Sequence, residues 1–375
     1  MRITYIAQDI DSVSGLGRIA LAYATAMTSA GHDITLLCQR SSAPGMRRAI
    51  VPGFPGVRSV DKLLFRVSEP VRSLAARGDI RHAFGIGSRA DIVSAQSCHR
   101  SGVEFQKNLP SERIRRRNFG LYDMLSLQDE HRLMTSPRTR LVLAVSDLVR
   151  SQLIRWYGLP EEKIIVLPNG IDTARYATPL DRDAARERYR MPKGSFILGF
   201  LGNEFDRKGV QTIIEALPLL RDLPLSVCVA GADDPTPYIR RADALSVGGR
   251  VHFIGRVREP EEFLRTLDMF VFPVNYEPFG MVVTEAMAAG VPVITARAVG
   301  AVEGMTSGQE GLFLDDPLSA TELASAIRRL VADPVLRDHI ARTGRQAASA
   351  FDWHVICSRL ETVYRTVNAA SRGSR

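Results

Sequence analysis

The sequence has 375 residues, of which 45% are hydrophobic and 24% charged, and its formal net charge is +8. This length and balance are typical of a two-domain globular protein and argue against a disordered or fibrous chain. The four cysteines form no Cys-x-x-Cys pair, so neither a zinc site nor a disulfide framework is indicated. The early acidic residues and the lack of a long apolar run argue against a signal peptide or a membrane-spanning helix. We therefore expect a reduced, cytoplasmic protein.

The positive charge is confined to the first half of the chain. Residues 1–175 hold 25 Lys and Arg against 16 Asp and Glu, whereas residues 176–375 hold 24 against 25. The densest basic stretch is residues 113–117, which contain four arginines. A one-sided basic surface suits an anionic membrane or a phosphorylated glycolipid, although a solvated arginine-rich surface would have the same composition. Nucleic acid is not expected, because the sequence has no recognised binding motif.

Strands and helices alternate along the first half. The expected strands cover residues 2–7, 33–38, 91–95, 141–145 and 164–167, and the expected helices cover 17–30 and 147–157. This alternation predicts a parallel, doubly wound sheet. Gly15 and Gly17 precede the first helix, where they could let the backbone approach a ligand or could form an ordinary turn.

The second half repeats the pattern. The expected strands cover residues 196–201, 225–230, 251–254, 269–272 and 292–295, and the expected helices cover 260–267 and 319–332. Two Rossmann-like domains, 1–175 and 176–353, joined by a polar linker near 172–190, are the simplest account. A helix over about 354–367 follows, with one apolar face, and we expect residues 368–375 to be disordered.

Two glutamates frame the loop after the expected strand 269–272. Glu277 and Glu285 are separated by seven residues that include Gly280 and the start of a helix. Backbone N–H groups at a helix start suit a phosphate, whereas carboxylates suit the hydroxyl groups of a sugar. The pattern therefore indicates a nucleotide-sugar. The alternative is a plain loop residue followed by a first-turn acid.

A basic loop follows the expected strand 196–201. Arg207 and Lys208 precede Gly209 there, and they offer a planar fork and a point charge to an anion. A solvated basic pair is the alternative interpretation. Because loops at the carboxyl ends of parallel strands converge on one ligand crevice, we expect this loop and the glutamate loop to act together.

These two loops, with Pro168–Asp172 and Gly15-Leu16-Gly17, resemble the retaining glycosyltransferases of family 4. The resemblance covers nearly the whole chain, although residues 43–140 add little to it. It implies the GT-B architecture, an α/β fold of two Rossmann-like, doubly wound domains facing an interdomain cleft. The first domain would bind the acceptor, the second would bind the donor, and the terminal helix would pack back on the first. The implied reaction moves a sugar from a nucleoside diphosphate sugar to a glycan or glycolipid, in cell-envelope polysaccharide or lipopolysaccharide synthesis.

The resemblance also assigns roles to residues. Arg207 and Lys208 would stabilise the leaving diphosphate, while Glu277 and Glu285 would accept hydrogen bonds from the donor sugar and the ribose. The expected donor-binding residues are Gly15, Gly17, Arg207, Lys208, Val257, Glu277, Phe279, Gly280, Met281 and Glu285. The expected catalytic residues are His99, Arg207, Lys208 and Glu277, with a structural role as the alternative for His99. For Glu130 and His131 we prefer the solvated face of a helix.

No cofactor or metal is expected. Two cations at the diphosphate could take the place of a divalent ion, and Asp233-Asp234 is better explained as a charged turn than as a metal ligand pair.

Two other function classes stay open. Gly15–Ala20 fits Gly-x-Gly-x-x-Ala, and Arg40 could accept a 2′-phosphate, as in an NADP-dependent oxidoreductase. Against this class, the loop before Gly15 is too long for the tight turn and no acidic residue ends the second strand. A catalytically inactive nucleotide-sugar-binding protein is the other alternative.

Overall fold

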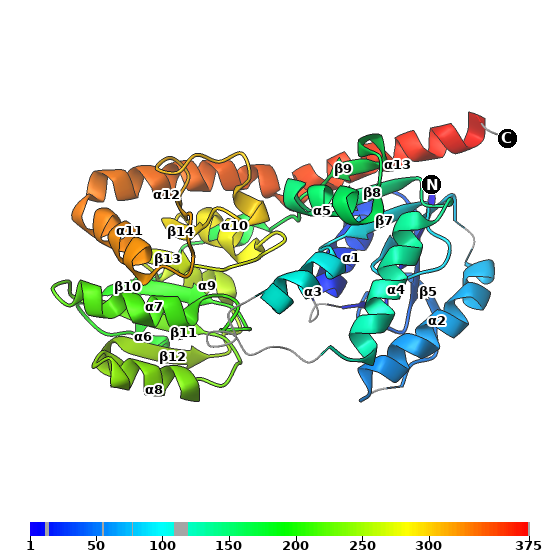
Figure 1. The fold of residues 1–375 in the computed structure, drawn as a ribbon. Coiled ribbons are helices and arrows are strands. Elements are labelled where there is room, and N and C mark those ends of the chain that lie inside the picture. Colours follow the sequence, from blue (N-terminus) through cyan, green and yellow to red (C-terminus); the bar gives the residue numbers. More distant parts are fainter. Residues whose placement is uncertain (12–14, 55, 77, 109–118, 374–375) are drawn as a thin grey trace. The chain divides into compact units, whose positions relative to one another are not determined.

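The computed structural model describes residues 1–11, 15–54, 56–76, 78–108 and 119–373. These residues form two compact units, each built on its own sheet (Figure 1). The first unit contains the described residues up to Gly170 together with those from Trp353 onward, and the second contains Ile171–Asp352. The basic stretch 113–117 lies outside the described residues.

The first unit is built on a seven-stranded parallel sheet. Its strands, in spatial order, are β5 (Arg47–Ile50), β3 (Asp33–Cys38), β1 (Arg2–Ile6), β6 (Ile80–Phe84), β7 (Ile92–Ala95), β8 (Leu141–Ala144) and β9 (Ile164–Val166). A small separate pair joins β2 (Asp9–Ile10) to β4 (Arg40–Ser41). The central strands are continuous runs of buried residues, as expected when helices cover both faces of a parallel sheet.

Helices cover this sheet in two rows. Helix α1 (Gly15–Ser29) contacts α13 (Trp353–Gly373), which also contacts β6. The other row contains α2 (Arg58–Ala75), α3 (His99–Asn108), α4 (Leu121–Thr135) and α5 (Asp147–Tyr157). Right-handed crossovers place these two rows on opposite faces, because the chain leaves β1 in one direction and returns in the other. A short turn, η1 (Glu161–Lys163), precedes β9.

Tyr364 anchors the C-terminal helix in the core of the first unit. Its hydroxyl lies 2.9 Å from that of Tyr5 and 2.6 Å from His82 Nδ1, while His82 Nε2 lies 2.8 Å from Ser94 Oγ. His82 is fully buried, and this burial lowers the pKa of its imidazole to about 3. The strand that carries His82 was missed in the sequence, since Arg81 and His82 interrupt its apolar pattern.

The second unit is built on a six-stranded parallel sheet. Its strands, in spatial order, are β12 (Val251–Gly255), β11 (Leu225–Ala230), β10 (Phe196–Leu201), β13 (Met269–Phe272), β14 (Val293–Ala296) and β15 (Leu312–Leu314). Its helices are α6 (Arg182–Arg188), α7 (Val210–Ala216), α8 (Thr236–Ala244), α9 (Pro260–Arg265), α10 (Met281–Ala288), α11 (Ala320–Ala332) and α12 (Pro334–Ala348). Short 3-10 turns are η2 (Thr173–Tyr176), η3 (Leu217–Leu220), η4 (Gly248–Arg250), η5 (Gly300–Val302) and η6 (Ser349–Phe351).

The structure adds detail to the expected linker and corrects the expected end of the terminal helix. The expected linker near 172–190 is ordered, since η2 packs on α9 and α10, and Asp181 caps α6 by accepting a hydrogen bond from Ala184 N over 3.0 Å. The terminal helix does not end near 367 but runs from Trp353 to Gly373. Val367, the expected last residue, is buried, and its carbonyl accepts a hydrogen bond from Arg140 over 3.0 Å, so the helix is still packed on the first unit where it was expected to end.

None of the helices in the described ranges combines the length and apolar character that crossing a bilayer requires.

Candidate functional site

Two loops of the second unit lie side by side, because they follow neighbouring strands. Strands β10 and β13 pair in parallel, with Leu198 opposite Met269, so their carboxyl ends meet at one edge of the sheet. The loops after them, 202–209 and 273–280, then touch. Gly209 has φ +84°, and a Cβ on it would come 2.1 Å from Pro273 O. Only glycine permits this approach of the two loops.

Arg207 joins the two loops through its guanidinium. Its Nη1 donates to Tyr276 O over 2.5 Å and to Glu277 Oε2 over 3.3 Å, and its Nε donates to Glu204 Oε2 over 2.7 Å. Burial acts to lower the pKa of Arg207, but Glu277 and Glu204 outweigh burial and the net pKa is raised. Arg207 is therefore a fixed cation, and it orients the Glu277 carboxylate.

Lys208 is a cation held in a poorly solvated place. Its ammonium lies 5.5 Å from the centroid of the Phe272 ring, and a Cβ on Gly202 would come 3.1 Å from Nζ. Burial lowers the pKa of Lys208; Glu277 partly offsets this effect and Arg207 adds to it. An anion bound beside Lys208 would be stabilised by the ammonium charge, which the protein itself only partly neutralises.

Helix α10 begins directly at the glutamate loop. Its N-cap residue Gly280 has φ +90°, and a Cβ there would come 2.8 Å from Val299 Cγ1 and 3.2 Å from Glu277 Cγ. The loop is fixed from its other side, because Phe279 O accepts from Ala301 N over 2.7 Å. The first backbone N–H groups of α10, starting at Met281, have no acceptor within the helix and point toward its N-terminal end.

Glu285 lies on the second turn of α10, beside a tyrosine that sequence reasoning missed. Tyr176 on η2 is buried, and its pKa is raised first by burial and then by the Glu285 carboxylate. The missed signal is its place four residues after the Pro168–Asp172 motif. Glu277 and Glu285 therefore lie at the loop and on the helix that the sequence predicted.

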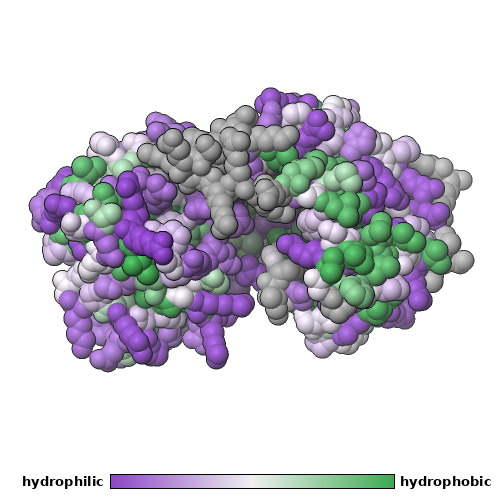
Figure 2. Space-filling view, turned by 60° about the horizontal axis from the view of Figure 1, so that its bottom comes forward, coloured by the Kyte–Doolittle hydropathy of each residue, from purple (hydrophilic) through white to green (hydrophobic). Residues whose placement is uncertain are grey.

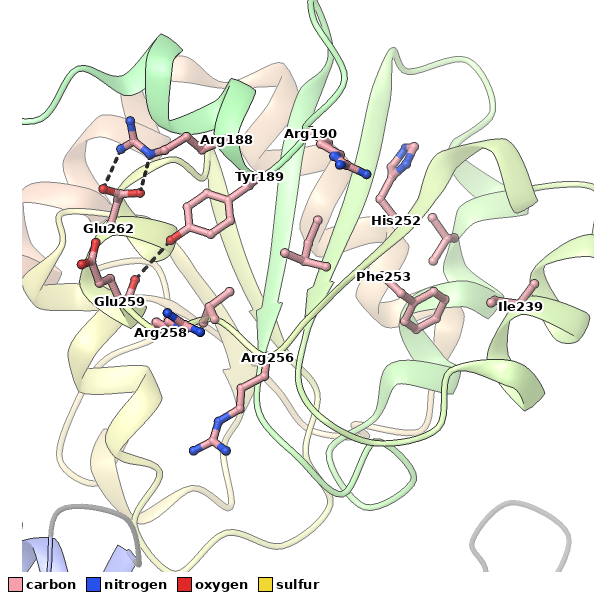
Figure 3. A pocket seen from close by; sticks show the side chains of 13 residues that line it. Arg188, Tyr189, Arg190, Ile239, His252, Phe253, Arg256, Arg258, Glu259 and Glu262 are labelled. Carbon is pink, nitrogen blue, oxygen red and sulfur yellow. Dashed lines mark hydrogen bonds and ion pairs between the residues drawn. The ribbon is translucent and has the colours of Figure 1, made fainter.

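Val257 lies two strands away from this pair of loops. It follows β12, the edge strand, and lines a cavity of about 900 Å³ (Figure 3). On one side of that cavity Arg188 and Glu262 form an ion pair of 2.6 Å and Tyr189 reaches Glu259 O. Two strand spacings are about 10 Å, a separation that suits the base and the diphosphate of one nucleotide.

His99 begins α3 in the first unit, and a buried carboxylate fixes it there. Glu130 accepts hydrogen bonds from His99 N over 2.7 Å, from Arg100 N over 3.2 Å and from the Tyr157 hydroxyl over 2.5 Å. Its side chain is buried, so the expectation of a solvated face was wrong for Glu130, although it holds for the exposed His131. The physical reason is the helix start, whose N–H groups attract a carboxylate.

The His99 side chain faces a small polar cavity. Its Nε2 lies 3.7 Å from Asp123 Oδ1. The cavity has a volume of about 200 Å³, and its polar lining includes Gln8, Lys62, Ser94, Gln96, Ser97, Tyr122, Ser126 and Glu130. This lining suits a small hydroxyl-rich group. Gly15 and Gly17 lie in the first turn of α1, and Leu16 between them lines the same cavity.

The comparisons with known proteins agree with this architecture. The family profile Glycosyl transferases group 1 matches residues 181–347, and the profile Glycosyltransferase Family 4 matches residues 13–175. The chain belongs to glycosyltransferase family 4. The predicted family and fold class are therefore confirmed.

Curated relatives cover different parts of this family 4 chain. The chain is 29% identical to a glycogen synthase of Mycobacterium tuberculosis over 426 residues, spanning 100% of this chain and 96% of that one. It is 28% identical over 242 residues to the capsular polysaccharide biosynthesis glycosyltransferase CapM of Staphylococcus aureus, which is 62% of this chain and 63% of CapM. The match thus spans less than two thirds of CapM.

Solved structures share the fold. WaaG, a glycosyltransferase involved in lipopolysaccharide biosynthesis, superposes with a TM-score of 0.80 at 21% identity, over 96% of this chain and 99% of WaaG. HepE of Anabaena, in complex with UDP-glucose, superposes with a TM-score of 0.75 at 19% identity, over 98% and 100% of the two chains. At these identities the likeness shows the GT-B fold.

The dinucleotide features have structural roles in this family 4 protein. Arg40, the expected partner of a 2′-phosphate, binds Asp9 over 2.7 Å and Asp61 over 2.8 Å. The long connection between β1 and α1 contains β2, which pairs with β4. These contacts argue against the oxidoreductase alternative, because they occupy the arginine and replace the tight turn.

Asp233 and Asp234 also have structural roles. Asp233 accepts a hydrogen bond from Phe205 N over 2.8 Å, and Asp234 accepts one from Thr236 N over 3.0 Å. They therefore shape a turn, as the sequence suggested. Within the described ranges, no cluster of three or more His, Cys, Asp and Glu side chains could hold a metal ion.

Proposed function

We propose that this protein is a retaining glycosyltransferase that moves a sugar from a nucleoside diphosphate sugar to a glycan or glycolipid. The observation that carries the proposal is the contact between Arg207 and Glu277, with Lys208 beside it, where the β10 and β13 loops meet. Cations for a diphosphate and carboxylates for hydroxyl groups are then combined in one place. Family membership supports the same reaction class.

The proposed chemistry is electrostatic. As the bond from the sugar to the diphosphate breaks, negative charge grows on the leaving phosphate, and Arg207 and Lys208 stabilise it. Glu277 orients the donor sugar and Glu285 orients the ribose. These two cations take the role that a divalent metal has in other transferases, so the reaction is independent of added metal. His99 of the first unit is the further catalytic candidate, close to the donor sugar.

The relatives supply the first donor and the first class of acceptor to test. UDP-glucose, the ligand of HepE, is the first donor to test. Capsular polysaccharide and lipopolysaccharide synthesis, the settings named for CapM and WaaG, favour a cell-envelope glycan or glycolipid as acceptor. Such an acceptor would place the protein in the cytoplasm, at the anionic inner surface of the membrane.

The test is donor turnover. The purified chain is incubated with UDP-, GDP-, ADP- and dTDP-sugars and a cell-envelope glycan and lipid extract as acceptor, with and without EDTA, and release of the nucleoside diphosphate is measured. We expect the nucleotide-sugars of one base to be consumed, at a rate that EDTA does not change. Glu277→Gln should abolish release of the nucleoside diphosphate. NADP-dependent absorbance change would favour the oxidoreductase, and binding of a donor without turnover would favour an inactive binding protein.

A further inference from the structure

Helix α2 of the first unit buries several polar side chains against the rest of that unit. Asp61, Lys62, Glu69 and Ser73 are all buried. Asp61 accepts from Phe54 N over 2.8 Å, Lys62 donates to Ser126 Oγ over 3.0 Å and pairs with Asp129 over 3.4 Å, and Ser73 Oγ accepts from Arg81 over 2.6 Å. These contacts fix which face of α2 turns inward. Phe65 of α2 is also fully buried, but the four polar residues make this face far more polar than the inward face of an ordinary surface helix.

The outward face of α2 is apolar. Val60, Leu63, Val67 and Val71 are 40%, 50%, 68% and 68% exposed. Their spacing of three, four and four residues places them along one side of the helix. We call these four residues the α2 stripe.

The α2 stripe belongs to a larger exposed patch. Ile50 and Phe54 precede α2, Val57 is its N-cap, and Leu121 and Met124 lie at the start of α4, which packs against α2. Ten of the fifteen exposed large hydrophobic side chains of the described chain lie between residues 50 and 124, so the patch is a property of this region rather than of the whole surface. Figure 2 shows hydrophobic residues gathered on the unit that contains α2.

Arginines accompany the stripe on the same helix. Arg58 and Arg72 are exposed near its two ends, whereas Arg66 between them is only partly exposed and pairs with Asp129 over 3.1 Å. Arg58 lies over the Tyr122 ring at 4.7 Å. An apolar stripe beside arginines suits a helix that lies in a membrane interface, with the apolar side chains among acyl chains and the arginines near anionic headgroups.

We propose that α2 is the surface by which this protein binds an anionic lipid bilayer. Charge decides between the possible occupants. A second copy of the chain would bring the same arginines against one another and repel, whereas anionic headgroups complement them. The inference deepens the membrane part of the proposed function, but it rests on the first unit and uses none of the donor residues.

The test is vesicle sedimentation of the full chain with phosphatidylcholine vesicles, with and without phosphatidylglycerol. Val67→Asp is the diagnostic variant, and Val335→Asp is the matched control, since Val335 is also an exposed helical valine (80%) but lies on α12 of the second unit. Both substitutions add one negative charge to an exposed position, so both variants should keep the wild-type melting temperature. Donor turnover without vesicles is measured in parallel.

We expect the wild type and Val335→Asp to bind the anionic vesicles alike, and Val67→Asp to bind about tenfold more weakly. Arg72→Gln should weaken binding to anionic vesicles alone. Equal binding by Val67→Asp and the wild type, or equal binding to both vesicle types, would overturn the proposal. So would a concentration-dependent dimer that Val67→Asp abolishes, since that result assigns the stripe to a second copy. Vesicle binding without donor turnover would count against the proposed reaction only.

Discussion

The guanidinium of Arg207 and the carboxylate of Glu277 lie 3.3 Å apart, in two loops separated by about seventy residues of chain. This contact needs two conditions. Strands β10 and β13 must be neighbours, and residue 209 must be glycine, because a Cβ there would lie 2.1 Å from Pro273 O. Together with Lys208, it places two cations and one carboxylate where backbone N–H groups of α10 begin. The following predictions test this arrangement and its supports.

Lys208→Met should stabilise the ligand-free protein while it abolishes sugar transfer. The pKa of Lys208 is lowered in the folded state, chiefly by burial, so below that pKa the fold holds a charge that the unfolded chain solvates better. This destabilisation is fully present at neutral pH and disappears as the pH rises past the ordinary lysine pKa of 10.5. We expect a melting temperature about 2 °C higher at neutral pH, measured by calorimetry. A lower melting temperature of Lys208→Met at neutral pH would show that burial of the Lys208 charge does not destabilise the fold.

Gly280→Ala should damage both stability and donor binding. Its left-handed backbone alone disfavours alanine by about 1 kcal/mol, and the added Cβ would also push against Val299 and Glu277. Gly308→Ala is the matched control, because Gly308 has φ +92° but open space around its Cβ position. Calorimetric titration with UDP should show weaker binding for Gly280→Ala and unchanged binding for Gly308→Ala. Equal effects of the two variants would mean that only backbone strain acts.

Glu130→Gln should lower sugar transfer without changing UDP affinity. The carboxylate accepts hydrogen bonds from His99 N, Arg100 N and Tyr157, and an amide cannot accept all three. We expect a loss of about 1–3 kcal/mol in stability and a lower kcat as His99 shifts. Tyr157→Phe removes one of the three donors and should have a smaller effect. Unchanged kcat with a lowered melting temperature would restrict Glu130 to a structural role.

His82 should make the first unit sensitive to acid. Its folded-state pKa of about 3 lies below the ordinary value of 6.5, so the unfolded chain binds a proton that the folded chain does not. The stability that this residue supplies is fully present above pH 6.5 and is lost as the pH falls toward about 3. The melting temperature of His82→Gln should fall less steeply over this range than that of the wild type. Parallel slopes would contradict the buried neutral imidazole.

The sequence allowed the donor site to be predicted because its signals are local. The apolar runs of β10 and β13 were predicted with the bounds that the structure has, and each is followed directly by its polar loop. The convergence of the loops follows from the rule for parallel sheets. The order β11-β10-β13, which makes the two strands neighbours, depends on the whole topology and could not be derived from either segment.

Other features depend on contacts between distant segments. Apart from Phe65, the residues of α2 that are buried are polar, so its pattern favours the wrong face for the core. Their partners, such as Asp129 and Arg81, lie on other segments. Glu130 could be placed on a solvated face for the same reason, since the N-terminus of α3 that binds it lies about thirty residues away. On α13, Val367 O accepts a hydrogen bond from Arg140, which lies 227 residues away in the chain.

The most direct test of the diphosphate clamp is nucleotide binding by the wild type and Arg207→Ala, measured as the melting temperature with UDP, GDP, ADP, dTDP, NAD and NADP. Arg240→Ala, an exposed arginine on α8 of the same unit, is the control. A ligand of the folded state raises the melting temperature by mass action. We expect one nucleoside diphosphate to raise it in the wild type and in Arg240→Ala, with the shift lost in Arg207→Ala. A shift with NADP alone, or an undiminished diphosphate shift in Arg207→Ala, would contradict the account.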